Sequence, residues 1–441
     1  MTPADAAARG NREWMGVVLA SVLFSLAFLA VLPSRWNRSQ SVDYPIYYAP
    51  VARNLLDGKG FLTAEGRPAV AYPPGYPLLL AGVFTVARVT GFSELGVLRG
   101  FNVIMLATAS ALLYSVARLL FGIRTARLAA LAWMSYPLPL WLTKQPNTEL
   151  AFLMAFFGTV CIVFRILFRE GFRLRLAWSA GALVGVASLM RPAALALSVP
   201  VAVALFCNGR GWPKKQRWRT CAFLFLGNLL VIAPWELWAS RQVGEVIPLC
   251  TNGATAIRDG LSLDLKSGDL DRVVKVPEEV RALIQRFTQR ESEMKSPRLI
   301  ARFLGDAFVD RPASVTKLAA LKAIRSWYAT DSQQFEPYVA IIQAPYLLLA
   351  GVGGFAAWRR GGIFRDYVAF AALVLLYFWG MTILVLSIAR YMIPAMGLLM
   401  VLTGFALSTI LDRFRPPRRS LAPQLLRMTQ GSAGSRRSPL S

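Results

Sequence analysis

The chain has 441 residues, of which 55% are hydrophobic, and its mean hydropathy is +0.46. These values are too apolar for a soluble globular protein. A net charge of +25 would indicate a nucleic-acid partner in a soluble protein, but Arg and Lys collect here in short connections between apolar segments. That distribution is typical of a polytopic membrane protein, so nucleic acid is excluded as the expected partner.

Ten apolar segments are predicted to cross the membrane as helices, because about 20 apolar residues span the hydrocarbon. They cover residues 14–32, 98–119, 127–143, 149–168, 176–190, 193–208, 220–238, 338–358, 367–388 and 392–411. Every second connection is rich in arginine, whereas the opposite connections are nearly bare. The charge pattern therefore predicts that both termini face the cytoplasm. The first segment shows no clear cleavage site, so we expect it to remain as an anchor.

The connection between the first two predicted spans, residues 33–97, is the most informative stretch. Its charged side chains would each cost about 3 kcal/mol at the bilayer centre, so it is no plain span. Apolar residues at helical spacing predict an interfacial helix that begins near Ala49 and is stopped by Gly58. A second apolar segment, residues 72–91, is expected to be interfacial or re-entrant, because a crossing there would invert the charge bias of every later connection.

The hydrophilic segment from Arg241 to Glu336 is predicted to form a small extracytoplasmic cap with a helix over residues 276–289. Cys250 lies in this segment without a second cysteine, so no disulfide is predicted there. The tail after Pro416 is rich in Arg, Ser and Pro and is predicted to be disordered and held near anionic lipid.

Acid–base chemistry in this chain falls to carboxylates, Lys or Tyr, because the sequence contains no histidine. Asp43 is the leading candidate, since it follows the first span at the outer surface, where its carboxylate can accept a proton from an acceptor hydroxyl. The alternative role is a cap on the following helix, with Pro45 in the first turn, and the two roles are compatible. The sequence has no Walker A, GxGxxG, GxSxG or HExxH motif, which disfavours nucleotide-driven or zinc-dependent chemistry.

Two arginines lie at the predicted outer ends of helices, where the positive-inside rule disfavours them. They are Arg191 in SLMRPAAL and Arg390 in LSIARYMIPA. A guanidinium binds phosphate with a planar, two-pronged geometry, so both residues are predicted to hold a lipid phosphate. The alternative is that each side chain snorkels to lipid headgroups.

Glu149 opens the fourth predicted span. It is either a first-turn acid that complements the helix dipole or a second carboxylate in the substrate cavity. Lys144, five residues earlier, is available as its ion-pair partner or as a further phosphate contact. The other residues expected in the substrate cavity are Tyr44, Tyr72, Tyr76, Arg241 and Tyr391.

Four stretches of the sequence resemble one family, in the family's order. SVDYPIYYAPVARNLLDGKGF followed by AYPPGYPLLLAG resembles the first outer loop of GT-C membrane glycosyltransferases. Within that family, the resemblance is to bacterial dolichyl-phosphate-mannose–protein mannosyltransferase-like proteins and the aminoarabinose transferase group. The other three stretches are GALVGVASLMRPAAL, APWELWASRQVGEVIPLCTNGA and ARYMIP.

The resemblance implies an all-α, GT-C-like bundle of about ten spans with interfacial helices, an extracytoplasmic active site, polyprenyl-phosphate-linked sugar donors and inversion at the anomeric carbon. Asp43 matches the first-loop acid, and Arg191 and Arg390 match basic positions near the donor. Many relatives have Asp-Glu where this chain has Asp43-Tyr44. The motifs assemble no metal site, so no cofactor is expected, and the sequence leaves a divalent metal open.

The expected organisation is an N-terminal transmembrane catalytic module over residues 1–238, which includes the outer loop 33–97. A cap over 239–337, C-terminal transmembrane helices over 338–412 and a basic cytoplasmic tail over 413–441 follow.

The expected function is transfer of a sugar from a polyprenyl-phosphate donor to an extracytoplasmic glycan, lipid or protein acceptor, in the bacterial inner membrane. Asp43 would be the base, and the arginines would stabilise the leaving phosphate. The alternatives are a carrier or flippase for lipid-linked saccharides and a lipid ligase. Polarity concentrated at the outer surface, rather than at mid-membrane depth, favours the transferase.

Overall fold

The computed structural model describes residues 3–37, 41–263, 276–330 and 335–414. In these ranges the chain is helical, apart from turns, loops and one isolated antiparallel bridge between Leu62 and Pro68. The predicted all-α fold is therefore confirmed. The predicted basic tail lies outside the described residues from position 415 onward.

Seven helical segments of the described chain are long and apolar enough to cross a membrane, so the chain is an integral membrane protein. They are α1 (Pro3–Val31), α4 (Glu94–Phe121), α7 (Glu149–Arg165) with η2 (Ile166–Glu170), α10 (Lys214–Val243), α15 (Glu336–Arg360), α16 (Gly362–Leu384), and η5 (Ala389–Met392) with α17 (Ile393–Arg413).

The remaining three predicted spans fall on shorter helices. These are α5 (Ile123–Met134) with α6 (Pro137–Leu142), α8 (Leu174–Met190), and η3 (Pro192–Ala194) with α9 (Ser198–Asn208). The prediction of one continuous helix over residues 127–143 is wrong. Pro137 has no N–H, and Tyr136 before it adopts an extended conformation (φ −78°, ψ 117°), so the helix breaks there.

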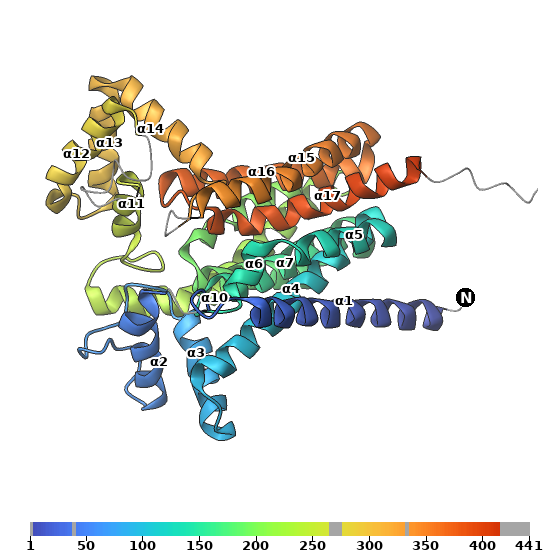
Figure 1. Ribbon diagram of the computed structural model, residues 1–441, viewed down its shortest axis with the longest axis horizontal. Helices are drawn as coiled ribbons and strands as arrows, with labels where there is room; N and C mark the ends of the chain where they lie inside the picture. The colour runs from blue at the N-terminus through green and yellow to red at the C-terminus, as the bar shows by residue number, and fades with distance from the viewer. Residues whose placement is uncertain (1–2, 38–40, 264–275, 331–334, 415–441) are drawn as a thin grey trace, which may run out of the picture.

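The first outer loop folds into η1 (Tyr44–Tyr48), α2 (Ala49–Leu56) and α3 (Gly75–Thr90). The predicted start of the interfacial helix at Ala49 is confirmed, and Gly58, with φ at 73°, follows its end. Helix α3 leaves the bundle at an angle instead of joining the long helices (Figure 1). The next helix, α4, returns the chain to the bundle core.

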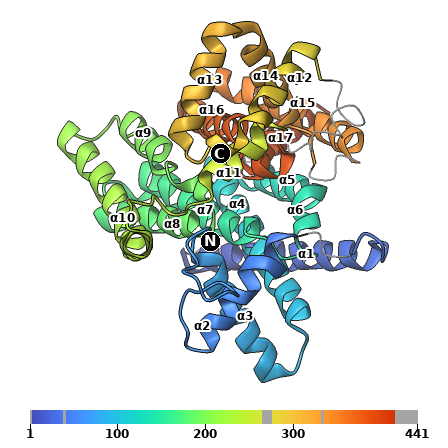
Figure 2. The same ribbon diagram turned by 90° about the vertical axis from the view of Figure 1, so that its left-hand side faces the viewer.

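The cap contains α11 (Gly253–Leu261), α12 (Glu278–Gln289), η4 (Glu291–Glu293), α13 (Pro297–Asp310) and α14 (Pro312–Arg325). Helix α12 confirms the predicted helix over residues 276–289. These helices enclose an apolar cluster of their own, which includes Leu283, Phe287 and Leu318. The cap projects from the end of the bundle at which α2 also lies (Figures 1 and 2).

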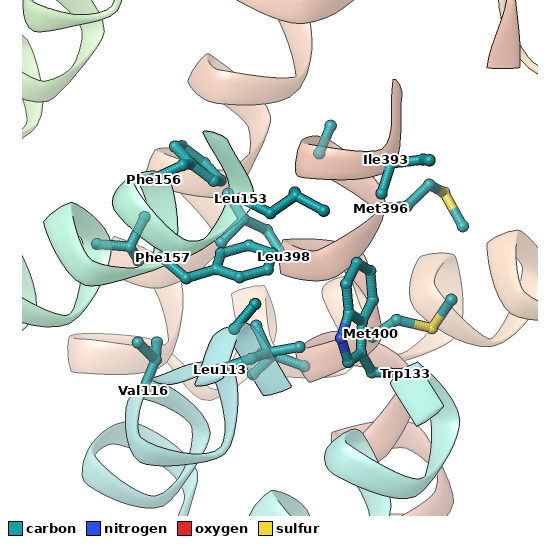
Figure 3. Close-up of a cluster of buried hydrophobic side chains, with 14 of the residues drawn as sticks. Leu113, Val116, Trp133, Leu153, Phe156, Phe157, Ile393, Met396, Leu398 and Met400 are labelled. Atoms are coloured by element: carbon teal, nitrogen blue, oxygen red, sulfur yellow. The ribbon is translucent and has the colours of Figure 1, made fainter. Parts of the chain in front are cut away.

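The bundle core joins α4, α5, α7 and α17. Leu113, Trp133, Phe157, Met396 and Met400 meet there, all buried (Figure 3). Helices α8 and α10 approach so closely that a Cβ on Gly181 would lie 1.9 Å from the carbonyl oxygen of Leu224. Backbone contact through glycine is a typical way for membrane helices to pack, since lipid tails give them no hydrophobic drive to associate.

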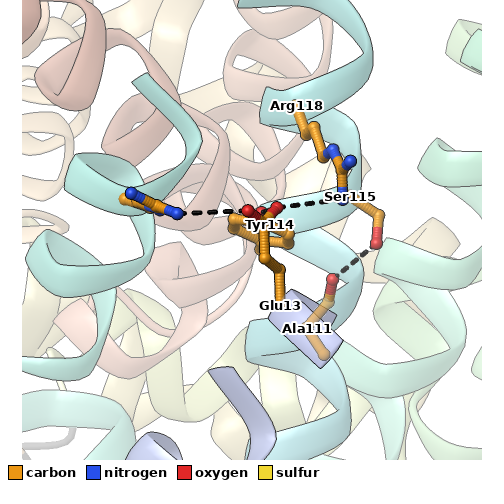
Figure 4. A network of polar contacts seen from close by, with 6 residues as sticks. Glu13, Ala111, Tyr114, Ser115 and Arg118 are labelled. Carbon is orange, nitrogen blue, oxygen red and sulfur yellow. Dashed lines mark hydrogen bonds and ion pairs between the residues drawn. The ribbon is translucent and has the colours of Figure 1, made fainter. Parts of the chain in front are cut away.

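Charged residues tie the helices together at one end of the bundle. Glu13 of α1 pairs with Arg118 of α4 at 3.2 Å (Figure 4). It also pairs with Arg127 of α5 at 3.1 Å. Arg124 of α5 pairs with Asp412 of α17. Helix α1 therefore begins, and α17 ends, at the same end, which we call the Glu13 end.

Candidate functional site

Asp43 stands at the first turn of η1 with an exposed side chain. The hydroxyl of Tyr72 donates a hydrogen bond to its Oδ1 atom at 3.2 Å. The alternative role of a helix cap is wrong, because Asp43 has helical backbone angles and makes no side-chain capping bond. Its carboxylate is therefore accessible from outside and oriented by a tyrosine.

Four tyrosines form a layer beneath Asp43. The ring of Tyr72 lies 4.9 Å from that of Tyr47 and 5.1 Å from that of Tyr48, and the rings of Tyr48 and Tyr76 lie 5.0 Å apart. Burial and the neighbouring charge of Asp43 raise the pKa of Tyr72. Tyr72 therefore stays protonated and remains a donor to the carboxylate.

The first outer loop is pinned to the chain that follows α10. The backbone N–H groups of Thr251 and Asn252 donate to the carbonyls of Val70 and Ala71, at 3.0 and 3.3 Å. At Gly75 a Cβ would lie 2.6 Å from the carbonyl oxygen of Leu189, so α3 begins directly against the end of α8. Three of the stretches that carry the family resemblance thus meet in space beside Tyr72.

A buried carboxylate joins the two outer arginines. Glu149 Oε1 lies 2.7 Å from Nη1 of Arg191 and 3.5 Å from Nε of Arg390, and the Glu149 side chain is only 7% exposed. The guanidinium groups of Arg191 and Arg390 lie over the ring of Tyr391, at 4.6 and 5.4 Å from its centroid. Glu149 is thus the shared counter-ion of both arginines as well as a first-turn acid of α7.

The two arginines differ in exposure. The side chain of Arg191 is 13% exposed, which contradicts the alternative that it snorkels to headgroups, whereas that of Arg390 is 36% exposed. Arg390 also lies farther from Glu149, so it is the arginine better placed to reach an incoming anion.

Asp43 and the arginine cluster lie around the same aromatic side chains. Burial raises the pKa of Tyr48, and the charges of Asp43, Arg191 and Glu149 all act on its hydroxyl. Tyr391 contacts both arginines and is also close enough to Tyr72 for an electrostatic interaction between the two hydroxyl groups. The structure thereby brings together five of the predicted site residues besides Glu149, at the end of the bundle opposite Glu13: Asp43, Tyr72, Arg191, Arg390 and Tyr391. Tyr48 was missed as a site residue, because its apolar helical spacing was its one distinguishing feature in the sequence.

Tyr76 and Tyr44 support this site from behind. Tyr76 is 1% exposed, and its hydroxyl lies near the charge of Glu149 and the backbone of Asn147. Tyr44 is half-buried and near the ion pair between Arg53 and Glu94, which measures 2.8 Å. Both residues shape the wall of the site.

Lys144 and Arg241 lie elsewhere. The Lys144 ammonium donates to the carbonyl of Trp36 and lies 3.7 Å from the ring centroid of Trp141. Burial and the neighbouring Arg99 lower the pKa of Lys144 to about 8. Glu149 pairs with Arg191 and Arg390 in place of Lys144. Arg241 is exposed on the last turn of α10.

The cap holds the turn that carries Arg390. The backbone N–H of Ala389 donates to the carbonyl of Ala329 at 2.8 Å. The buried ammonium of Lys322 donates to the carbonyl of Val385 at 2.9 Å. Sequence reasoning missed this connection, because a lysine on a polar loop helix shows no pattern that distinguishes a buried partner from solvent.

A divalent metal finds few ligands here. In the ranges that the structure describes, no three His, Cys, Asp or Glu side chains gather into a group able to hold one. Within the site Glu149 is already engaged by two arginines, which leaves Asp43 as the accessible carboxylate. These residues do not fit a bound metal, and no step below uses one.

Comparison with known proteins agrees with the predicted resemblance. Residues 71–238 match the family model described as dolichyl-phosphate-mannose-protein mannosyltransferase. This segment contains Tyr72, Glu149 and Arg191 but neither Asp43 nor Arg390. No curated protein has a sequence that matches the chain.

Two solved structures of the oligosaccharyltransferase from Archaeoglobus fulgidus share the fold. The structure of AglB in complex with an inhibitory peptide and a dolichol-phosphate is 16% identical, with a TM-score of 0.54 over 97% of this chain and 52% of that chain. The structure tethered to an acceptor peptide with the NVT sequon is 14% identical, with a TM-score of 0.55 over the same shares of both chains. The present chain thus spans about half the length of these enzymes.

A structure of ArnT from Cupriavidus metallidurans bound to undecaprenyl phosphate is 16% identical over 96% of this chain and 80% of that chain. Its TM-score of 0.40 is too low to support an inference. The family match and the fold shared with the archaeal structures confirm the resemblance to GT-C membrane glycosyltransferases.

We predict that Glu149→Gln destabilises the protein by about 3 kcal/mol, because two guanidinium groups lose their shared buried anion. Thermal unfolding of the purified protein in detergent measures the change. The double variant Glu149→Gln/Arg191→Gln should lose much less stability than the sum of the losses of the two single variants, because the second change removes one of the charges left without a partner. Additive losses would show that the pair is not coupled.

Proposed function

We propose that this chain is a membrane glycosyltransferase that moves a sugar from a polyprenyl-phosphate donor to a hydroxyl of an extracytoplasmic acceptor. One observation carries the proposal: the accessible carboxylate of Asp43 and the arginine pair of Arg191 and Arg390 lie around the same tyrosines. A base beside a cationic phosphate site is the arrangement that inverting transfer requires.

In the proposed reaction Asp43 accepts the proton of the acceptor hydroxyl while Tyr72 holds the carboxylate in place. The acceptor oxygen attacks the anomeric carbon from the face opposite the phosphate, so the configuration inverts. The bond between the anomeric carbon and the phosphate oxygen breaks, and its electron pair stays on the phosphate. The arginines stabilise that growing charge, and Asp43 releases its proton to the solvent.

The charge of the cluster favours a donor with a single phosphate. Two guanidinium groups and one carboxylate leave one net positive charge, which balances the single negative charge of a phosphodiester. The family name and the dolichol-phosphate in the A. fulgidus structure support a lipid-linked donor, and the peptides in those structures support an acceptor bound to the same fold.

The expected orientation has both termini in the cytoplasm and the Asp43 site outside the inner membrane of a bacterium. A Glu65→Cys variant should react with a membrane-impermeant maleimide on intact spheroplasts, because the Glu65 side chain is 62% exposed at the Asp43 end. Cys207, exposed at the end of α9, should react only after lysis. In the labelled variant Cys250 is mutated to Ser, because burial raises the pKa of its thiol and would slow its reaction with the maleimide. Labelling of Cys207 but not of the cysteine introduced at position 65 in intact spheroplasts would show that the protein has the opposite orientation in the membrane.

The catalytic role predicts that Asp43→Asn folds normally and loses about 10²–10⁴-fold in transfer rate, because the amide cannot accept the proton. The assay follows transfer of a radiolabelled sugar from polyprenyl phosphate in proteoliposomes. Glu65→Gln, which removes another exposed acid of the same loop, should transfer at the wild-type rate. Near-normal turnover of Asp43→Asn would remove Asp43 from the mechanism. Movement of the lipid-linked sugar across the membrane without any transfer by wild type would identify a carrier instead.

The phosphate role predicts that Arg390→Lys lowers kcat/KM for the donor, because an ammonium keeps the charge but loses the two-pronged geometry. A charge-assisted hydrogen bond is worth about 1.5–3 kcal/mol, so the loss should be roughly 10- to 100-fold. Arg191→Lys should lower the melting temperature as well, since Arg191 is the more buried partner of Glu149. Arg241→Lys, on an exposed position, is the control. Wild-type kcat/KM in both site variants would place the phosphate elsewhere.

A further inference from the structure

Two basic turns at the Glu13 end lie beside acids. Glu13 neutralises Arg118 and Arg127, with Tyr114 donating a hydrogen bond to the same carboxylate at 2.8 Å (Figure 4). In the turn between α7 and α8, Glu170 lies 3.1 Å from Arg165 and 3.4 Å from Arg173. These arginines are therefore at least partly compensated within the protein.

The turn between α9 and α10 is different. Its residues 207–219, CNGRGWPKKQRWR, contain five basic side chains and no acid. Two of the five donate hydrogen bonds inside the turn. The guanidinium of Arg217 donates to the carbonyls of Trp212 at 3.0 Å and Arg210 at 2.9 Å, and Nε of Arg210 donates to the carbonyl of Cys207 at 3.3 Å. The turn is thus held in a defined shape by two of its own arginines.

Four of the five basic side chains reach the surface. They are Arg210, Lys214, Lys215 and Arg219, all exposed. Trp218 stands among them with 65% of its surface exposed, and its ring packs against Phe206 at 5.0 Å. An exposed indole beside cations, at the ends of two apolar helices, is typical of the boundary between bilayer and water.

The chemistry of this surface selects a membrane lipid. Four like charges repel one another when no acid lies between them, and a phosphate group would relieve that repulsion. The turn lies where lipid phosphates are concentrated, and Trp218 offers an apolar contact to the adjoining acyl region. We propose that the α9–α10 turn is a binding site for the phosphate headgroup of an acidic phospholipid. The site lies at the opposite end of the bundle from Asp43 and does not depend on the proposed transferase activity.

Native mass spectrometry of the full chain, titrated with phosphatidylglycerol or phosphatidylcholine, tests the proposal. Each basic residue near an anionic membrane surface contributes about fivefold in affinity, so Lys214→Gln/Lys215→Gln/Arg219→Gln should bind phosphatidylglycerol roughly 100-fold more weakly. The matched control, Arg169→Gln/Arg173→Gln/Arg175→Gln, removes the same charge from the turn that contains Glu170 and should bind within a few-fold of wild type. Lys214→Arg/Lys215→Arg keeps the charge and should also bind like wild type.

Two results would overturn the proposal. One is equal binding of phosphatidylglycerol and phosphatidylcholine by the wild type. The other is an equal loss in both triple variants, which would show attraction to net charge without a site. Melting temperatures of all variants are compared in phosphatidylcholine, and if the first triple variant does not fold, Lys214→Gln/Lys215→Gln replaces it, with an expected loss of about 25-fold on the same scale.

Discussion

The candidate site depends on one buried carboxylate. Glu149 contacts Arg191 and Arg390, which are 199 positions apart in the sequence, and so joins the start of α7, the end of α8 and the turn before α17. Two guanidinium groups over one ring, that of Tyr391, would repel each other without an anion between them. Because Glu149 is buried, its attraction is weakly screened and can hold both arginines in place before any substrate arrives.

Around this centre the site is assembled from separate pieces of chain, each fixed by backbone hydrogen bonds. The first outer loop brings Asp43 and Tyr72, and Thr251 pins that loop through Val70. The cap pins the Arg390 turn through Ala329. The proposed transfer needs Asp43 and the arginine pair at a constant separation, and attachment of both loops to the bundle would favour that.

The two ends of the bundle differ in how their charged side chains are arranged. At the Asp43 end, Glu149 and Arg191 form a buried ion pair near the exposed Asp43, whereas the ion pairs of the Glu13 end include the exposed Arg127. Glu13 joins α1 to α4 and α5, and Glu170 pairs with arginines on both sides of the turn between α7 and α8. The α9–α10 turn, which contains no acid, keeps its positive charge for the membrane.

The sequence by itself determined the all-helical fold and the positions of most helices, although not the break before Pro137. Apolar length sets the spans, and Pro50 with Gly58 sets the limits of α2, because these are properties of neighbouring residues. The partners were decided by the tertiary structure. Lys144 lies five residues from Glu149 and was the nearest basic partner in sequence, yet it turns toward Trp36 and Trp141, while arginines from two distant segments reach the carboxylate. Ion pairing follows distance in space, which local sequence patterns do not contain.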